Sequence, residues 1–388
     1  MRPSKRLERI PPYAFAELER KIAAKRAAGI DVISLGIGDP DRPTPPLIVE
    51  AMQEAVTEPE THRYPTNRGR EDFREAVCDF YERQFDVKLD REREVIPAIG
   101  AKEAIFNLNL ALLDPGDYAL AADPGYPVYT AGPWLAGGEP VLMALEPDRG
   151  FTPDLEAIDA EVRSRAKLMY LNYPNNPTGA IAPDGFFERV VEFARENDIL
   201  VVHDNAYSQI TFDGYHAPSF LATPGAKDVG IEVFSLSKGY NMTGWRCAVV
   251  AGNAETIETY WRLKTNIDSG LFEAVQLAAI AALEPETDAE VASMHELYLR
   301  RRDLVCDALR KIGVNVHPPH ATIYVWAPVP EGFSSSEAYC EHVLEQAAVV
   351  LSPGSIYGPA GEGWFRISLT TPDERLLEAV KRLGSLSP

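Results

Sequence analysis

Short apolar runs alternate with helical stretches through the middle of the chain, from about residue 95 to residue 252. The runs are rich in β-branched and aliphatic residues, as strands buried on both faces of a sheet are. The clearest runs cover residues 118–122, 141–145, 168–172, 199–203, 232–235 and 247–251. Between two of them, residues 185–197 place apolar side chains at helical spacing. This alternation predicts an α/β fold with a mostly parallel central sheet and helices on both faces.

The two ends of the chain follow other patterns. Residues 16–28 are rich in Ala, Glu, Lys and Arg, which predicts a helix that stops at Gly29. Residues 253–312 predict long helices with an interruption near Pro285. Beyond them, strands are predicted near residues 323–327, 349–351 and 364–369. The C-terminal segment is therefore expected to be α+β.

The chain has 388 residues, which is more than one compact domain usually holds. Hydrophobic residues at 45% and charged residues at 25% are the proportions of a globular protein, which argues against a disordered chain. We expect an N-terminal arm of residues 1–15 and a large α/β domain of residues 46–285. A small α+β domain is expected from residues 16–45 together with residues 286–388.

The chain is also strongly acidic, with 38 Lys and Arg residues against 58 Asp and Glu residues and a formal net charge of -20. This charge argues against nucleic-acid and anionic-membrane partners, because both need positive patches. It does not exclude an anionic ligand, since a buried site can be basic inside an acidic protein.

Several features bear on location. No stretch approaches the ~20 apolar residues of a membrane span, and the basic N-terminus lacks the apolar segment of a signal peptide. The cysteines are widely spaced, with no Cys-x-x-Cys pair and no His at zinc-finger spacing. They are Cys78, Cys247, Cys306 and Cys340. We therefore expect a cytoplasmic protein with buried thiols and no metal site.

Polar residues follow the predicted strands at the edge where open α/β sheets bind ligands. They are Tyr126, Asn176, Asp204, Tyr207, Ser235, Ser237 and Lys238. Each has an ordinary structural explanation, because an aspartate often caps a helix, Asn-Pro-Thr-Gly is a good turn, and a lysine is usually solvated. Together they predict one crevice that holds a carboxylate, an amide, an amine, hydroxyls and aromatic rings.

The order and spacing of these residues resemble the fold-type I pyridoxal-phosphate enzymes, specifically the class I/II aminotransferases. The resemblance runs from Leu35 to Arg366. Its motifs are Asn176-Pro177-Thr178-Gly179, Asp204 with Tyr207, and Ser235-Leu236-Ser237-Lys238 with Arg246 eight residues on. It implies the fold-type I transferase fold, pyridoxal 5'-phosphate as the cofactor, and a homodimer with composite active sites. It also implies ping-pong transfer of an amino group between an L-amino acid and 2-oxoglutarate.

The resemblance gives each motif residue a role toward the cofactor. Lys238 would form the Schiff base with the cofactor aldehyde and then move the proton at the substrate α-carbon. Asp204 would pair with the pyridine nitrogen and keep it protonated. Asn176 and Tyr207 would donate to the ring oxygen, and Tyr126 would stack on the ring face.

The phosphate is expected at the start of the helical stretch 103–113, where the amides of Ala101 and Lys102 point at an anion. In the family pattern the remaining phosphate ligands come from the lysine motif. They are Ser235, Ser237 and Arg246. Tyr64 matches the family tyrosine that reaches the phosphate of the neighbouring subunit, although a turn tyrosine packed on Pro65 is the structural alternative.

The substrate carboxylate should be bound by Arg366, because an arginine inside an apolar strand is costly unless it is paired. By resemblance, Gly38 adds a backbone amide and Asn176 a side-chain contact to the substrate. The lack of a side chain at Gly38 permits this close approach. Tyr13 of the arm is expected to close over the site.

Within the family, three stretches look most like the LL-diaminopimelate aminotransferases of lysine biosynthesis. They are residues 35–40, 240–246 and 264–270. Residues 6–13 depart from the plant-type pattern, which leaves the contacts to the distal end of the substrate open. Aspartate- or alanine-type aminotransferases and a carbon–sulfur β-lyase on the same fold remain alternatives. A cofactor-binding domain of a transcription regulator is disfavoured, because the chain is acidic and only about 15 residues precede the small domain.

Overall fold

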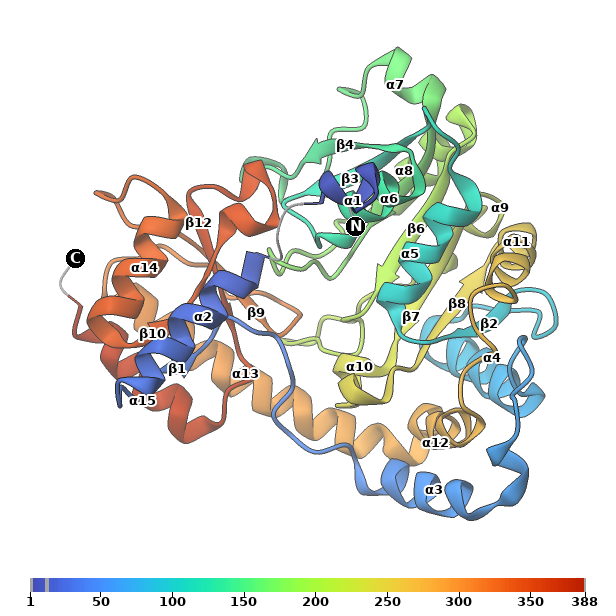
Figure 1. Ribbon diagram of the computed structural model, residues 1–388, viewed down its shortest axis with the longest axis horizontal. Coiled ribbons are helices and arrows are strands. Elements are labelled where there is room, and N and C mark those ends of the chain that lie inside the picture. The colour runs from blue at the N-terminus through green and yellow to red at the C-terminus, as the bar shows by residue number, and fades with distance from the viewer. Residues whose placement is uncertain (1–2, 11–13, 387–388) are drawn as a thin grey trace.

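The structure is a computed structural model that describes residues 3–10 and 14–386 (Figure 1). Its central sheet has seven strands in the order β2-β8-β7-β6-β5-β3-β4. Their bounds are β2 (Val95–Ala98), β3 (Tyr118–Asp123), β4 (Glu139–Ala144), β5 (Ala166–Leu171), β6 (Leu200–Asn205), β7 (Gly230–Ser235) and β8 (Ala248–Gly252). Strands β4, β3, β5, β6 and β7 are parallel, whereas β8 is antiparallel to both of its neighbours. The predicted α/β fold with a mostly parallel sheet is confirmed.

Successive side chains of the central strands point to opposite faces of the sheet, and each face has its own apolar core. Leu168 and Tyr170 of β5 pack in a cluster with α5 and α6, whereas Met169 and Leu171 pack in the cluster that contains α4 and α8. Helices of the large unit are α4 (Glu71–Phe85), α5 (Ala101–Leu112), α6 (Val128–Ala136), α7 (Ala160–Arg165), α8 (Phe186–Asn197), α9 (Ala226–Val229), α10 (Leu236–Gly239) and α11 (Ala254–Lys264).

A second, smaller layer contains α2, β1 and the C-terminal part of the described chain, whereas the N-terminal α1 (Lys5–Glu8) packs on α6 of the large layer (Figure 1). Its antiparallel sheet has the order β11-β12-β9, and a short parallel pair joins β1 to β10. The strands are β1 (Ile33–Ser34), β9 (Tyr324–Pro328), β10 (Val349–Val350), β11 (Ser352–Pro353) and β12 (Trp364–Ser368). Its helices are α2 (Ala14–Ala27), α14 (Ser336–Ala347) and α15 (Asp373–Gly384). Pairing of Ile33 with Val349 brings residues far apart in sequence into one layer.

Long helices connect the two layers. The remaining helices are α1 (Lys5–Glu8), α3 (Pro46–Thr57), α12 (Glu273–Leu283) and α13 (Asp288–Lys311), and short 3-10 turns are η1 (Pro59–His62), η2 (Pro147–Arg149), η3 (Phe220–Ala222), η4 (Thr243–Trp245), η5 (Pro285–Thr287), η6 (Gly354–Tyr357) and η7 (Pro359–Gly361). Helix α12 packs on α3, and α13 runs from this pair to the small layer (Figure 1). Across the ranges 3–10 and 14–386, no helix is long and apolar enough to cross a membrane.

Candidate active site

Most of the predicted residues come together where the carboxyl ends of β5, β6 and β7 face the second sheet. Asn172 at the end of β5 donates from Nδ2 to the backbone oxygen of Asp204 at 2.7 Å and so links the exits of β5 and β6. Arg366, from the second sheet, donates from Nη1 to Oδ1 of Asn176 at 2.8 Å. The site therefore lies between the two layers and uses residues from both.

Asp204 is buried at the end of β6, and its two carboxylate oxygens have different surroundings. Oδ2 accepts a hydrogen bond of 2.7 Å from the hydroxyl of Tyr129 in α6, whereas Oδ1 is buried with no partner among the described residues. Burial raises the pKa of Asp204 to about 6, and the hydrogen bond from Tyr129 opposes that rise. A buried acceptor without a partner requires a donor, and the protonated ring nitrogen of pyridoxal phosphate fits this requirement.

Lys238 lies in the short helix α10 that directly follows β7. The hydroxyl of Ser235 caps this helix by accepting a hydrogen bond of 3.2 Å from the amide of Ser237. The amine of Lys238 donates to the carbonyl of Gly38 at 2.5 Å. This contact places the only lysine of the family motif beside the loop that precedes α3.

The start of α5 and Arg246 form one surface. Gly100 caps α5 with φ 83° and without a side-chain hydrogen bond. A Cβ atom added to Gly100 would lie 2.2 Å from Nη2 of Arg246, so the guanidinium lies directly against this turn. The amides of Ala101 and Lys102 begin the helix here, while the Lys102 ammonium is 5.8 Å from the ring centre of Tyr126. A helix N-terminus beside a guanidinium suits a phosphate group.

Arg366 is buried in β12 and has neutral hydrogen-bond partners only, among the described residues. Besides Asn176, it donates from Nη2 to the carbonyl of Gly36 at 2.7 Å, and Nε has no partner. The ring of Tyr324 lies 3.9 Å from its guanidinium carbon. A buried cation with no carboxylate beside it is suited to bind an anion from outside, such as a substrate carboxylate.

Two predicted residues lie outside this cluster. Tyr13 lies outside the residues that the structure describes. Tyr64 is 89% exposed on the loop between η1 and α4.

Tyr126 lies two residues before α6, with its ring in edge contact with Tyr129 at 5.9 Å.

No sequence motif predicts three further tyrosines of the site, which are Tyr129, Tyr324 and Tyr357. Tyr129 follows Tyr126 by three residues at the start of a helix, so helical spacing could have identified it as a neighbour. Tyr324 and Tyr357 come from the second sheet and its flanking turn, and both rings contact the Arg366 guanidinium, at 3.9 and 4.8 Å. No local motif marks them, because their contacts depend on how the two layers pack.

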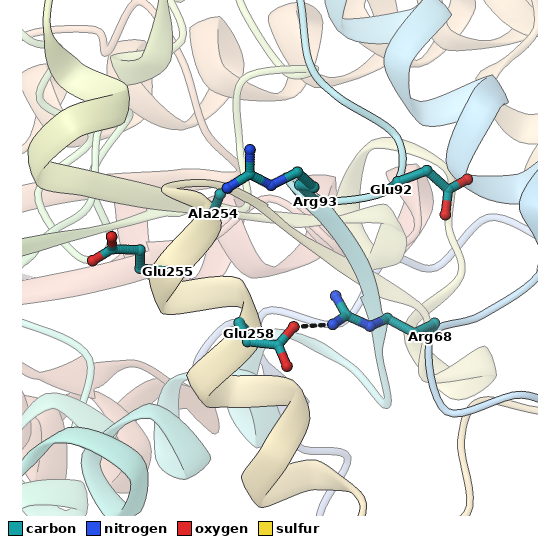
Figure 2. Close-up of a pocket in the computed structure, with 6 residues that line it drawn as sticks. All are labelled: Arg68, Glu92, Arg93, Ala254, Glu255 and Glu258. Atoms are coloured by element: carbon teal, nitrogen blue, oxygen red, sulfur yellow. Dashed lines mark hydrogen bonds and ion pairs between the residues drawn. The ribbon is translucent and has the colours of Figure 1, made fainter.

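A separate pocket of about 310 Å³ lies on the outer surface, at the start of α11 (Figure 2). It is lined by Arg68, Glu92, Arg93, Ala254, Glu255 and Glu258. Arg68 pairs with Glu258 and stacks on Trp261 at 4.4 Å. None of the predicted site residues lines this pocket, so it is not the crevice described above.

Comparisons with known proteins identify the family of the chain. The family model described as aminotransferase class I and II matches residues 30–383. An LL-diaminopimelate aminotransferase of Desulforudis audaxviator is 55% identical over 380 residues, which cover 98% of this chain and 96% of the relative. One of Moorella thermoacetica is 52% identical and covers 99% and 98%. Apo-BacF of Bacillus subtilis superposes with a TM-score of 0.96 at 38% identity, over 100% of this chain and 99% of that one.

Proposed function

Because the chain belongs to the aminotransferase class I and II family, we propose that it is a pyridoxal-phosphate enzyme that transfers an amino group between LL-diaminopimelate and 2-oxoglutarate. The donor assignment is supported by the relatives of that name, which are 48–55% identical over nearly the whole chain. Amino transfer itself is supported by the convergence of Lys238, Asp204 and Arg366.

The observation that carries the proposal is the unpartnered Oδ1 of buried Asp204. It is the acceptor that a protonated pyridine nitrogen needs, and no structural role of Asp204 accounts for it. Lys238 would hold the cofactor covalently, the start of α5 with Arg246 would hold its phosphate, and Tyr126 would lie on its ring. When bound, pyridoxal phosphate supplies an electron sink that stabilises negative charge at the substrate α-carbon.

The chain's own residues then orient the amino acid and move its proton. Arg366 would bind the α-carboxylate in a two-pronged contact, with Asn176 holding the guanidinium in plane. The Gly38 backbone would bind the same carboxylate. The amine of Lys238 would take the proton from the α-carbon, because its contact with Gly38 places it beside the carboxylate site.

The same proposal covers the assembly, the domains and the compartment. A homodimer is supported by Tyr64, whose 89% exposed side chain is available to the phosphate site of a second subunit. The division into residues 1–15, 46–285, and 16–45 with 286–388 is supported by the separate sheets of the two layers. A cytoplasmic location is supported by the four free thiols.

Donor competition tests the function. The purified protein with pyridoxal phosphate would be given LL-diaminopimelate, aspartate, alanine or an aromatic amino acid, each with 2-oxoglutarate, and glutamate formation would be measured. We expect LL-diaminopimelate to be the fastest donor. A faster reaction with aspartate or alanine would refute the donor assignment. Release of pyruvate from a cysteine-type substrate, without glutamate formation, would identify a carbon–sulfur β-lyase instead.

A further inference from the structure

Tyr324 lies at the centre of the candidate site, although no motif of the sequence marks it. It is the first residue of β9 and is 3% exposed. Its hydroxyl lies 3.2 Å from the hydroxyl of Tyr207, and the two rings meet edge to face at 5.6 Å. The opposite layer of the molecule therefore supplies a direct neighbour to a residue that the proposed function places on the cofactor.

The same side chain contacts the carboxylate site. Its ring centre lies 3.9 Å from the guanidinium carbon of Arg366, within the range of a cation–π contact. A Cβ atom added to Gly38 would lie 2.1 Å from the Tyr324 hydroxyl oxygen, so the phenol packs directly against the backbone of the Gly38 loop. One residue thus touches the expected cofactor ligand, the expected carboxylate ligand and the loop that meets Lys238.

We propose that Tyr324 is a positioning residue for amino transfer: its hydroxyl donates to Tyr207 and its ring holds the guanidinium of Arg366. The inference rests on the proposed function, because Tyr207 and Arg366 act in catalysis only if the cofactor and a carboxylate bind there. Tyr207 has a single proton. If that proton points to the cofactor's ring oxygen, the Tyr207 oxygen is free to accept a hydrogen bond from Tyr324.

The electrostatics favour this direction of donation. Burial raises the pKa of Tyr207 well above its usual value. Burial also opposes ionisation of Tyr324, but the positive charges of Arg366 and Lys238, together with hydrogen bonding to Tyr207 and Arg366, hold the pKa of that phenol below its ordinary value. The two nearby positive charges polarise the Tyr324 hydroxyl, which makes it a good hydrogen-bond donor. The ionisable groups that interact with it are Tyr207, Lys238, Tyr298, Tyr357 and Arg366.

The backbone around Tyr324 fixes its position. Thr322 adopts φ 77°, a left-handed conformation that is rare for a β-branched residue, and its hydroxyl accepts a hydrogen bond of 3.2 Å from the amide of Tyr324. The amide of Thr322 donates to the carbonyl of Ile210 at 2.9 Å. The start of β9 is therefore tied to the segment that follows Tyr207, which keeps the two phenols together.

The roles of the Tyr324 hydroxyl and of its ring can be tested separately. Tyr324→Phe removes the donor to Tyr207 but keeps the ring on Arg366. A weaker donor at the ring oxygen destabilises the deprotonated chromophore, so the pH midpoint of the visible absorbance change of the cofactor-loaded enzyme should rise by roughly 0.2 to 0.7 pH unit. The KM for glutamate should stay within about twofold, because the cation–π contact persists. Tyr324→Leu should shift the midpoint similarly and raise the KM about 3- to 30-fold.

The experiment is a spectroscopic pH titration of the cofactor-loaded enzyme, with steady-state kinetics and a melting temperature for each variant. Tyr339→Phe is the matched control, since Tyr339 is a buried tyrosine of the same layer whose ring packs on Phe333 and Phe365. Its midpoint should equal that of the unmodified protein. Tyr207→Phe is the positive control and should raise the midpoint at least as much as Tyr324→Phe.

The possible failures are distinguishable. If Tyr207→Phe shifts the midpoint while Tyr324→Phe leaves it unchanged, donation from Tyr324 is refuted and the proposed function stands. If Tyr324→Leu leaves the KM at the value of Tyr339→Phe, the role of the ring is refuted. If the unmodified protein shows no visible absorbance band with pyridoxal phosphate and no amino transfer, the proposed function is wrong and this inference falls with it.

Discussion

In the candidate site, burial disfavours the charged form of a side chain that the proposed function needs charged. Asp204 is the clearest example, because burial raises the pKa of its carboxyl to about 6 while one of its oxygens has no partner among the described residues. When no protonated ring nitrogen is bound to it, the ionised form of Asp204 lowers the free energy of unfolding. An unfavourable side chain that no structural contact explains indicates a ligand site rather than a core position.

Replacing Asp204 with Asn should therefore separate stability from function. The folded-state pKa of about 6 lies above the ordinary value of an aspartate, 3.8, so the ionised aspartate destabilises the cofactor-free fold as the pH rises through about 6. At pH 8 the cofactor-free Asp204→Asn protein should be more stable by up to about 3 kcal/mol, a difference that should vanish near pH 4. Urea unfolding at both pH values measures this, and amino transfer should be largely lost.

Asp198→Asn is the control for that comparison. Asp198 is exposed at the end of α8 with φ 55°, a conformation that Asn also adopts readily. The Asp198→Asn substitution should leave both the free energy of unfolding and the rate of amino transfer almost unchanged. Equal stability of the Asp204→Asn protein and the unmodified protein at pH 8 would show that Asp204 is not strained in the cofactor-free state.

Lys238 allows a second test at the scale of one residue. Lys238→Arg keeps a positive charge near Gly38, but a guanidinium stays protonated and cannot bond the cofactor aldehyde. We expect amino transfer to fall by roughly 10³-fold or more. Borohydride reduction followed by mass spectrometry should add the mass of the cofactor to the unmodified protein and to Lys88→Arg, an exposed control, but not to Lys238→Arg. Labelling of the Lys238→Arg protein would place the reactive amine elsewhere.

At the scale of elements, the loop between β1 and α3 depends on the small layer for its position. Gly36 accepts hydrogen bonds from Ser352 and Arg366 at 2.8 and 2.7 Å. Arg301 of α13 holds the other end of the loop through Asp41, with contacts of 2.7 and 2.9 Å. Because Gly38 lies between these two anchors, the carboxylate site should be as well ordered as this loop.

Breaking the anchor at Arg301 should weaken substrate binding. Arg301→Met leaves the Asp41 carboxylate, which is 12% exposed, without its cation. We expect the free energy of unfolding to fall by about 2–4 kcal/mol and the KM for glutamate to rise roughly tenfold, with a smaller change in kcat. Arg301→Lys should recover part of the loss, because a point charge lacks the fork geometry. Arg300→Met, an exposed neighbour on the same helix, is the control, and a KM equal to that control would exclude an anchoring role for Arg301.

The elements that could be predicted are those whose patterns are local. The runs at 118–122 and 232–235 lie within β3 and β7, because strands buried on both faces appear as continuous apolar stretches. Strand β2 (Val95–Ala98) was not predicted, since it is four residues long and contains Pro97, which only an edge strand tolerates. Site residues at strand ends were predicted for the same local reason. Tyr324 was not, because its role arises from packing between layers.

At the scale of the whole molecule, the net charge of -20 and the basic site do not conflict. Arg366 and Lys238 lie between the layers, whereas many acidic side chains are on the outer surface and pair there with cations, as Glu345 does with Lys25.

The exposure of Tyr64 raises a different question, namely whether one chain contains a complete site. An 89% exposed tyrosine contributes little to its own fold, so its function should lie in contact with something outside the chain.

Mixing two impaired variants answers that question. Lys238→Ala removes the reactive amine of its own site, and Tyr64→Ala should lower activity by about tenfold or more if the tyrosine donates to the phosphate. When the two proteins are unfolded together and refolded, half of the dimers are mixed. In each mixed dimer the site of the Tyr64→Ala chain keeps Lys238 and receives Tyr64 from its partner. Activity should recover to about a quarter of that of the unmodified protein. A tyrosine that acts within its own chain would leave both sites of the mixed dimer damaged, and no activity would be regained.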